Sequence, residues 1–143
     1  MIAQNVISTN QIVITAADFD RLQVLLDSPS YRSTHAPLLL ALREELERSE
    51  IVAPDAIPRT VVTMHSQVRV RDLKSKEAEM YTLVYPGQAD INENKLSVLA
   101  PLGMALLGSQ VGQIVKFDAP AGQRRLKIEK VLYQPEASGD FHL

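Results

Sequence analysis

The sequence predicts an α+β protein, in which an antiparallel pair of helices precedes an antiparallel sheet that carries one short helix. Up to about residue 50 the apolar residues follow helical spacing, and from residue 61 onward their period is two. Pro54 and Pro58 lie between the two patterns. We therefore expect a helical hairpin, or short coiled coil, over residues 1–52, a linker over 53–60 and a sheet domain over 61–143.

Two amphipathic stretches define the hairpin. The first follows "QIVIT", a brief β-like stretch, and begins at a capping pattern in which Thr15 precedes Asp18 by three residues. The second begins near Pro37, a residue type that fits the first turn of a helix. Helices of roughly 12 and 14 residues would be about 18–21 Å long. "DSPSYRSTHAP" lies between them and is expected to be a loop. The apolar faces are Phe19, Leu22, Leu25 and Leu26, then Leu39, Leu42 and Leu46.

Alternating residues define the sheet. We expect Val61, Val62 and Met64 to open a strand, "SQVRVRDL" and "AEMYTLVYP" to form a hairpin, and "LSVLA" to resume the sheet. In "PLGMALLG" the leucines are expected to cover the sheet as a short helix, which Gly108 ends in a left-handed conformation. The last strand, "QRRLKIEKVLY", faces the core with Leu126, Ile128 and Val131. Its basic residues, Arg124, Arg125, Lys127 and Lys130, are interpreted as protection of a sheet edge.

Composition excludes several classes of chemistry. The 143 residues include no cysteine, which excludes disulfides and cysteine nucleophiles. The three histidines, His35, His65 and His142, lack metal-ligand spacing, and the glycines at 103 and 108 lack the lysine of a phosphate loop. No nucleophile motif is present. We expect no catalytic residue, metal or cofactor, and the protein is predicted not to be an enzyme.

Charge and hydropathy narrow the possible partners. The net charge of −2 divides into −4 over residues 1–58, where eight acids face four arginines, and +2 over 59–143, where eleven basic residues face nine acids. This asymmetry is too weak for autonomous DNA binding. No signal peptide or membrane-spanning run is found, so we expect a cytoplasmic protein without a membrane partner.

The stretch "KLSVLAPLGMALLGSQVGQIVKFDAPAG" resembles the C-terminal signature of the bacterial Gre transcript-cleavage factors. The segments "VVTMHSQVRVRDL", "TLVYPGQAD" and "YQPEASGDFHL" are similar to the regulators of nucleoside diphosphate kinase, Gre homologues with a shortened hairpin. The resemblance covers residues 12–143 and is most specific from Val61 onward. It implies an FKBP-like sheet domain and a partner, RNA polymerase, bound at the mouth of its secondary channel. Nucleic acid would then be contacted only through the polymerase complex.

The resemblance also implies where the contacts lie. In Gre factors the loop before the short helix grips the polymerase, and here this loop contains Ser97, Leu99, Ala100 and Pro101. Leu99 stands where those factors usually have an acid. We expect residues 99–101 to be exposed and to contact the polymerase. The hairpin tip would face the channel with Asp27, Ser30, Tyr31, Arg32 and His35.

Three functions compete. The first is a non-enzymatic regulator that binds RNA polymerase and competes with Gre factors without stimulating cleavage. The second is a true cleavage factor, which would need a pair of carboxylates at the tip to hold magnesium. The tip has one acid, Asp27, with Arg32 nearby, which favours the first. The third is an FKBP-like isomerase or chaperone module, which the absence of tryptophan disfavours.

Overall fold

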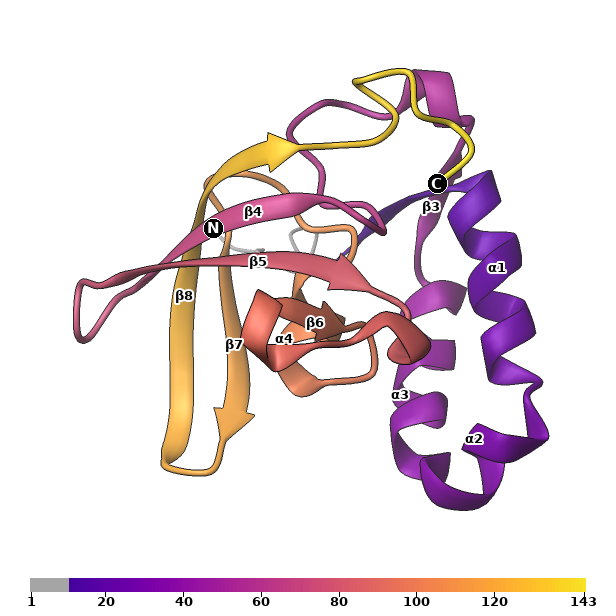
Figure 1. Ribbon diagram of the computed structural model, residues 1–143, viewed down its shortest axis with the longest axis horizontal. Coiled ribbons are helices and arrows are strands. Elements are labelled where there is room, and N and C mark those ends of the chain that lie inside the picture. Colours follow the sequence, from indigo (N-terminus) through magenta and orange to yellow (C-terminus); the bar gives the residue numbers. More distant parts are fainter. Residues whose placement is uncertain (1–10) are drawn as a thin grey trace.

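A computed structural model describes residues 11–143, which form a helical arm beside a curled, mostly antiparallel sheet (Figure 1). The predicted α+β class is confirmed. The arm contains α1 (Ala16–Leu26), α2 (Pro29–Thr34) and α3 (Ala36–Glu47), and the fourth helix is α4 (Pro101–Leu106). The strands are β2 (Val13–Thr15), β3 (Glu50–Val52), β4 (Gln67–Asp72), β5 (Ala78–Val84), β6 (Lys95–Ser97), β7 (Ile114–Ala119) and β8 (Gly122–Tyr133). Single 3₁₀ turns are η2 (Pro54–Ala56), η3 (Pro86–Gln88) and η4 (Ile91–Glu93).

The larger sheet has the strand order β6-β5-β4-β8-β7. All neighbours are antiparallel except β5 and β6, which are parallel. The alternation that predicted β4 is confirmed, because Val68 and Val70 are fully buried while Arg69 and Arg71 are half-buried. The expected strand at residues 61–64 is wrong. Only Val61 makes a single bridge, to Gln110, and the chain turns at His65, where φ is 68°.

The strand β8 is interior, so its interpretation as a sheet edge is wrong. It pairs with β4 on one side and β7 on the other. Arg124, expected at that edge, instead donates to two carboxylates, Asp72 at 2.8 Å and Glu79 at 2.7 Å. The order of strands depends on contacts between distant segments, which the charge pattern of one strand does not reveal.

The arm begins as the capping pattern predicts. Thr15 precedes α1 in extended conformation, and its Oγ1 accepts from the backbone N–H of Asp18 at 3.0 Å. The expected loop at 27–37 is partly wrong, since α2 occupies its centre. Pro29 lies in the first turn of α2, where a proline has no hydrogen bond to lose. In α3 the expected apolar face, Leu39, Leu42 and Leu46, is buried.

A short parallel ladder joins the two ends of the arm. Strand β2 enters α1 and strand β3 leaves α3, and they pair from Val13 with Glu50 to Thr15 with Val52. The backbone N–H of Val13 also donates to the carbonyl of Gly108 in the sheet domain at 3.1 Å. At the base of the arm, its two ends are therefore joined to each other by the ladder and to the sheet domain by this hydrogen bond.

Helix α4 covers the inner face of the sheet, as its sequence predicted. Leu102, Leu106 and Leu107 are buried, and Gly108 ends this segment with φ of 75°. A Cβ on Gly108 would lie 2.5 Å from the Cβ of Ile12. Gly108 is therefore required twice, by its left-handed backbone and by the close approach of the chain that leads into the arm.

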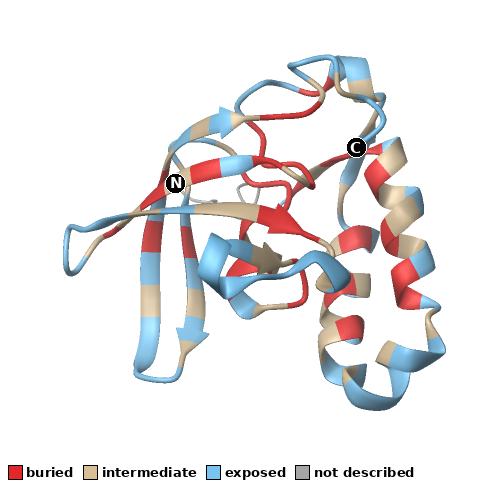
Figure 2. Ribbon diagram, in the orientation of Figure 1, coloured by how far each residue is buried: buried red, intermediate tan, exposed pale blue. Residues whose placement is uncertain are grey.

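One hydrophobic core runs through both parts (Figure 2). It joins Leu22 and Leu42 of the arm to Met64, Leu83 and Leu107 of the sheet domain. Each such side chain contributes about 1.5–3 kcal/mol when fully buried.

The division into residues 1–52, 53–60 and 61–143 remains a prediction. Within residues 11–143, every helix is too short or too polar to cross a bilayer.

The shared core can be tested at two glycines with left-handed backbones. Gly108→Ala and Gly112→Ala both impose strain, on the order of 1–2 kcal/mol, because φ is 75° and 95° at these positions. Only Gly108→Ala also collides with Ile12, whereas a Cβ on Gly112 meets nothing within 4 Å. We expect Gly108→Ala to lower the free energy of unfolding by about 2 kcal/mol more than Gly112→Ala, because overpacking adds about 1–3 kcal/mol. Urea denaturation measures this difference, and equal losses would contradict the close approach.

Candidate functional site

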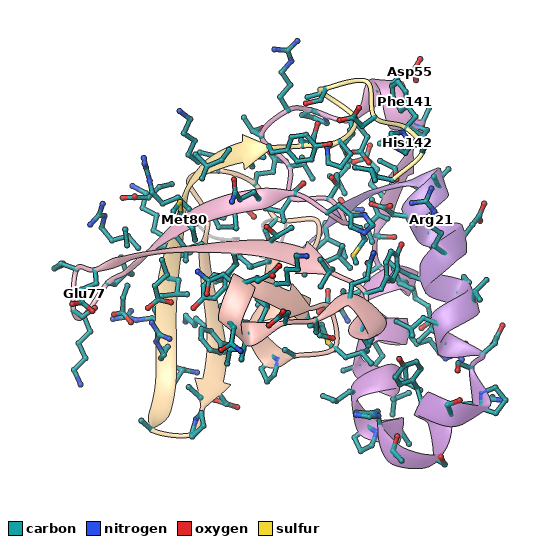
Figure 3. The ribbon with its side chains drawn as sticks, in the orientation of Figure 1. Arg21, Asp55, Glu77, Met80, Phe141 and His142 are labelled. Carbon is teal, nitrogen blue, oxygen red and sulfur yellow. The ribbon has the colours of Figure 1, made fainter. Side chains whose placement is uncertain are left out.

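The candidate site residues lie on several separate surfaces of the described part of the chain. In residues 11–143, no three histidine or carboxylate side chains converge as they would around a metal ion. His35 lies at the junction of α2 and α3, and His65 lies in a turn with Nε2 3.0 Å from Gln88 Oε1. His142 belongs to the C-terminal segment, next to Phe141 (Figure 3). The three histidines thus occupy different parts of the fold.

The predicted tip residues do come together at the far end of the arm. Asp27 ends α1, Ser30, Tyr31 and Arg32 lie in α2, and His35 caps α3. Asp27, Ser30 and Arg32 are exposed, while Tyr31 and His35 are half-buried, with ring centroids 5.7 Å apart. The tip therefore presents one carboxylate, one guanidinium and a small aromatic cluster.

The arm that carries this tip is short. Helices α1 and α3 have 11 and 12 residues, which corresponds to about 17 and 18 Å at 1.5 Å per residue. Their tips lie well away from the sheet, with α2 at the end of the arm (Figure 1). The arm holds its tip at a fixed distance because its buried face packs on the common core.

The loop before α4 differs from expectation at Leu99. Leu99 is only 4% exposed, so the expectation that it faces solvent is wrong. Its backbone N–H donates to Ser97 Oγ at 3.0 Å, and its side chain joins the core. Ala100 is half-buried and Pro101 is exposed. Pro101 begins α4, so the chain changes direction here, and the strand-like alternation of the sequence does not decide which side chains are buried.

Asp18 forms the joint between the arm and the sheet domain, a role that sequence analysis missed. It is 2% exposed, and its Oδ2 accepts from the backbone N–H of Met64 at 3.1 Å. Burial raises the pKa of Asp18 to about 7, with a smaller contribution from the nearby Glu136, while the hydrogen bond from Met64 acts in the opposite direction. Glu136 is itself held by Thr63 Oγ1 at 2.8 Å.

The sequence predicts that Asp18 lies in the first turn of a helix, but not that its carboxylate contacts the sheet domain. The capping pattern predicts that an acid at position 18 turns back to the first turn of its own helix. The structure instead directs the carboxylate across to the turn before β4. Arg21, one turn further along α1, donates to the carbonyl of Leu143, so the C-terminal segment also contacts the arm (Figure 3).

Comparison with known proteins matches both parts of the chain. Residues 57–133 match the family described as "Transcription elongation factor, GreA/GreB, C-term", and residues 10–52 match "Rnk N-terminus". Over 133 residues the chain is 40% identical to the regulator of nucleoside diphosphate kinase of Escherichia coli strain K12, covering 92% of this chain and 96% of that protein. The chain belongs to the GreA/GreB family, in its Rnk branch.

Two further relatives match this chain, one as a solved structure and one by sequence. A GreA/GreB transcription elongation factor from Nitrosomonas europaea has a solved structure that covers 86% of this chain and 98% of its own, with 42% identity and a TM-score of 0.72. The GreA of Thermotoga neapolitana is 36% identical over 93 residues, which are 65% of this chain but only 59% of that protein. The resemblance seen in the sequence is confirmed, and the chain is a Rnk-like regulator homologous to the GreA/GreB factors.

The Asp18 joint predicts a pH-dependent stability. Because the folded pKa of about 7 lies above the ordinary value of 3.8, the folded state binds this proton more tightly than the unfolded state. The free energy of unfolding should therefore fall as pH rises from about 4 to about 7. Asp18→Asn keeps an oxygen for Met64 but does not titrate. We expect the variant to gain about 2–3 kcal/mol relative to the wild type between pH 5 and 8.

Urea denaturation of the wild type and of Asp18→Asn, each at pH 5 and at pH 8, measures this difference in the free energy of unfolding. The difference between the two proteins removes the contribution of every other titrating group, since those groups are common to both. Parallel pH profiles for wild type and variant would show that the Asp18 carboxylate is not buried as described.

Proposed function

We propose that this protein is a non-enzymatic transcription regulator that binds RNA polymerase near its secondary channel and competes with Gre-type factors without stimulating transcript cleavage. Membership of the GreA/GreB family supports the polymerase as partner. The sheet domain would act as the part that grips the polymerase rim, and the arm as the part that enters the channel.

The composition of the arm tip is the observation that supports the absence of stimulated transcript cleavage. A Gre-type factor has to supply carboxylates to a magnesium ion, which prefers several hard oxygen ligands in near-octahedral geometry. The tip supplies the single carboxylate of Asp27, and the exposed Arg32 nearby repels a cation. Helices of about 17 and 18 Å also give the tip little reach. The tip would fill part of the channel without completing a metal site.

The remaining tip residues suit occupation of the channel. Ser30 is exposed and offers a hydroxyl, and the ring pair of Tyr31 and His35 offers polar atoms on a rigid base. Such groups can hold a position by hydrogen bonds without taking part in chemistry. Competition with a Gre factor then follows from occupying the same site.

The proposed rim contact is the exposed shoulder formed by Ser97, Ala100 and Pro101. Pro101 is exposed and Ser97 and Ala100 are half-buried. Leu99, the fourth residue that the resemblance implied, lies beneath this shoulder and would support its shape from the core. An acid at position 99 would therefore bury a charge in the core, which is costly.

A cleavage assay tests the proposal directly. With backtracked RNA polymerase complexes, purified protein and magnesium, we expect no release of short 3′ RNA fragments above the intrinsic rate. We expect the protein to lower the cleavage that an added Gre factor stimulates, in proportion to its concentration. Fragment release above the intrinsic rate that disappears in Asp27→Asn would establish the cleavage-factor function instead.

The rim contact is tested by Pro101→Glu, with Pro120→Glu as the control. Both prolines are exposed, and Pro120 lies in the turn between β7 and β8. Neither change should alter the free energy of unfolding by more than about 0.5 kcal/mol. We expect only Pro101→Glu to weaken binding to RNA polymerase, measured by fluorescence anisotropy. Equal binding by both variants would place the rim contact elsewhere.

A further inference from the structure

The outer face of the large sheet carries a separate basic surface. Side chains on β4, β8 and β7 alternate, so one set packs under α4 and the other faces solvent. The inner set includes Val70, Ile128 and Val115, which belong to the common core. The outer set is exposed or half-exposed, and we call its basic members the basic face: Arg69, Arg71, Lys116, Arg125, Lys127 and Lys130.

The strand pairing places these residues side by side. Arg71 is opposite Lys127, Arg69 is opposite Lys130, and Lys116 on β7 is opposite Arg125. Like charges directly opposite each other are unfavourable in a sheet. Glu129 lies against Arg69 and Arg71 and offsets part of this repulsion, whereas among residues 11–143 no ion pair offsets the repulsion between Lys116 and Arg125.

The charge of this face differs from that of the whole chain. Six basic residues on the outer side of these strands face two acids, Glu129 and Asp118, which gives +4. The chain as a whole carries −2, so the remainder carries −6. Charge is therefore segregated, and the excess of positive charge lies on the side of the sheet opposite α4 and the Pro101 shoulder.

The face already shows how it binds a carboxylate. Arg71 donates through Nε to Glu129 Oε2 at 2.6 Å and through Nη2 to Oε1 at 3.3 Å, and Arg69 Nε lies 3.2 Å from Oε1. This is the forked geometry that arginine uses for carboxylates. The other four basic residues of the face form no ion pair among residues 11–143: Lys116, Arg125, Lys127 and Lys130. Their charges therefore remain available to bind an acidic partner.

An open depression borders the basic face. A depression of about 410 Å³ is lined by Arg69, Val111, Gly112, Lys127, Ile128 and Glu129. A Cβ on Gly112 would meet nothing within 4 Å, so the depression is open at that point. Ile114 and Met80 are both about half exposed. They add apolar contact area on the same side, since Ile114 is opposite Lys127 and Met80 is opposite Arg69.

We propose that the basic face docks an acidic segment of a partner protein, laid across β4, β8 and β7. The alternative anionic partner, a nucleic acid strand, is less well matched. Single strands are held by stacking on aromatic side chains as well as by charge. The outward positions from residue 67 to 71, from 114 to 118 and from 123 to 130 carry no aromatic side chain. The isoelectric point of about 5.9 is also far below that of a typical nucleic-acid-binding domain.

The experiment compares two triple variants that lose the same charge. The first, Lys116→Gln with Arg125→Gln and Lys127→Gln, removes half of the basic face. The matched control, Arg59→Gln with Lys74→Gln and Lys76→Gln, removes three exposed basic residues elsewhere. Thermal unfolding of the control should match the wild type, and the face variant should be at least as stable, since it removes two of the like-charge pairs.

The probe is a short fluorescent poly-glutamate peptide, titrated by anisotropy at low and at physiological salt. We expect the Kd of the face variant to rise about tenfold, because each exposed charge contact contributes about two- to threefold. The control should change less than twofold, and salt should weaken wild-type binding. The measurement requires no RNA polymerase, so its failure leaves the proposed function untouched.

Three results would overturn the proposal. One is the absence of peptide binding, or an equal loss in both variants. Another is tighter binding to an oligo-uridine or a DNA duplex than to the peptide, which would assign the face to nucleic acid. The third is concentration-dependent self-association in sedimentation that the face variant abolishes. This would assign the face to the acidic arm of a second copy.

Discussion

The approach of the N-terminal strand to Gly108 is the contact on which the rest of the molecule depends. Isolated helices of 11 and 12 residues are marginal in water. Here they are stable because Ile12 and Ile14 lead the chain against α4, so that the leucines of the arm enter the same core as the sheet. The arm therefore takes its rigidity from the sheet domain. In the function that we propose, this rigidity holds the tip in one position inside the channel.

Sequence patterns predicted the features that depend on near neighbours. The helical spacing of Leu39, Leu42 and Leu46 and the alternation around Val68 and Val70 are local, and both were confirmed. Helix α2 was missed because proline and serine are typical of turns, although proline also suits a first helical turn. The interior place of β8 and the burial of Leu99 depend on which distant segments pack there. Neither could be read from the residues themselves.

In the candidate site, too, the sequence predicted what depends on neighbouring residues and missed what depends on distant ones. The tip residues are contiguous in sequence, so their convergence needed only the hairpin, whereas the joint at Asp18 links residues 46 positions apart. That joint places a titratable group where the two parts meet. Three surfaces lie around this joint: an arm with a net negative charge, a shoulder at Pro101, and a basic face on the opposite side of the sheet. In the functions that we propose, the arm and the shoulder engage RNA polymerase, and the basic face engages an acidic partner.

The ladder between β2 and β3 has a consequence for the size of the arm. Parallel strands cannot be joined by a tight turn, so the chain has to make a crossover between them, usually through helix. The arm is this crossover, extended outward. A crossover has a minimum length but no fixed maximum, and one added turn in each helix would lengthen the arm by about 5.4 Å. The reach of the arm can therefore change without any change in the ladder that holds its base.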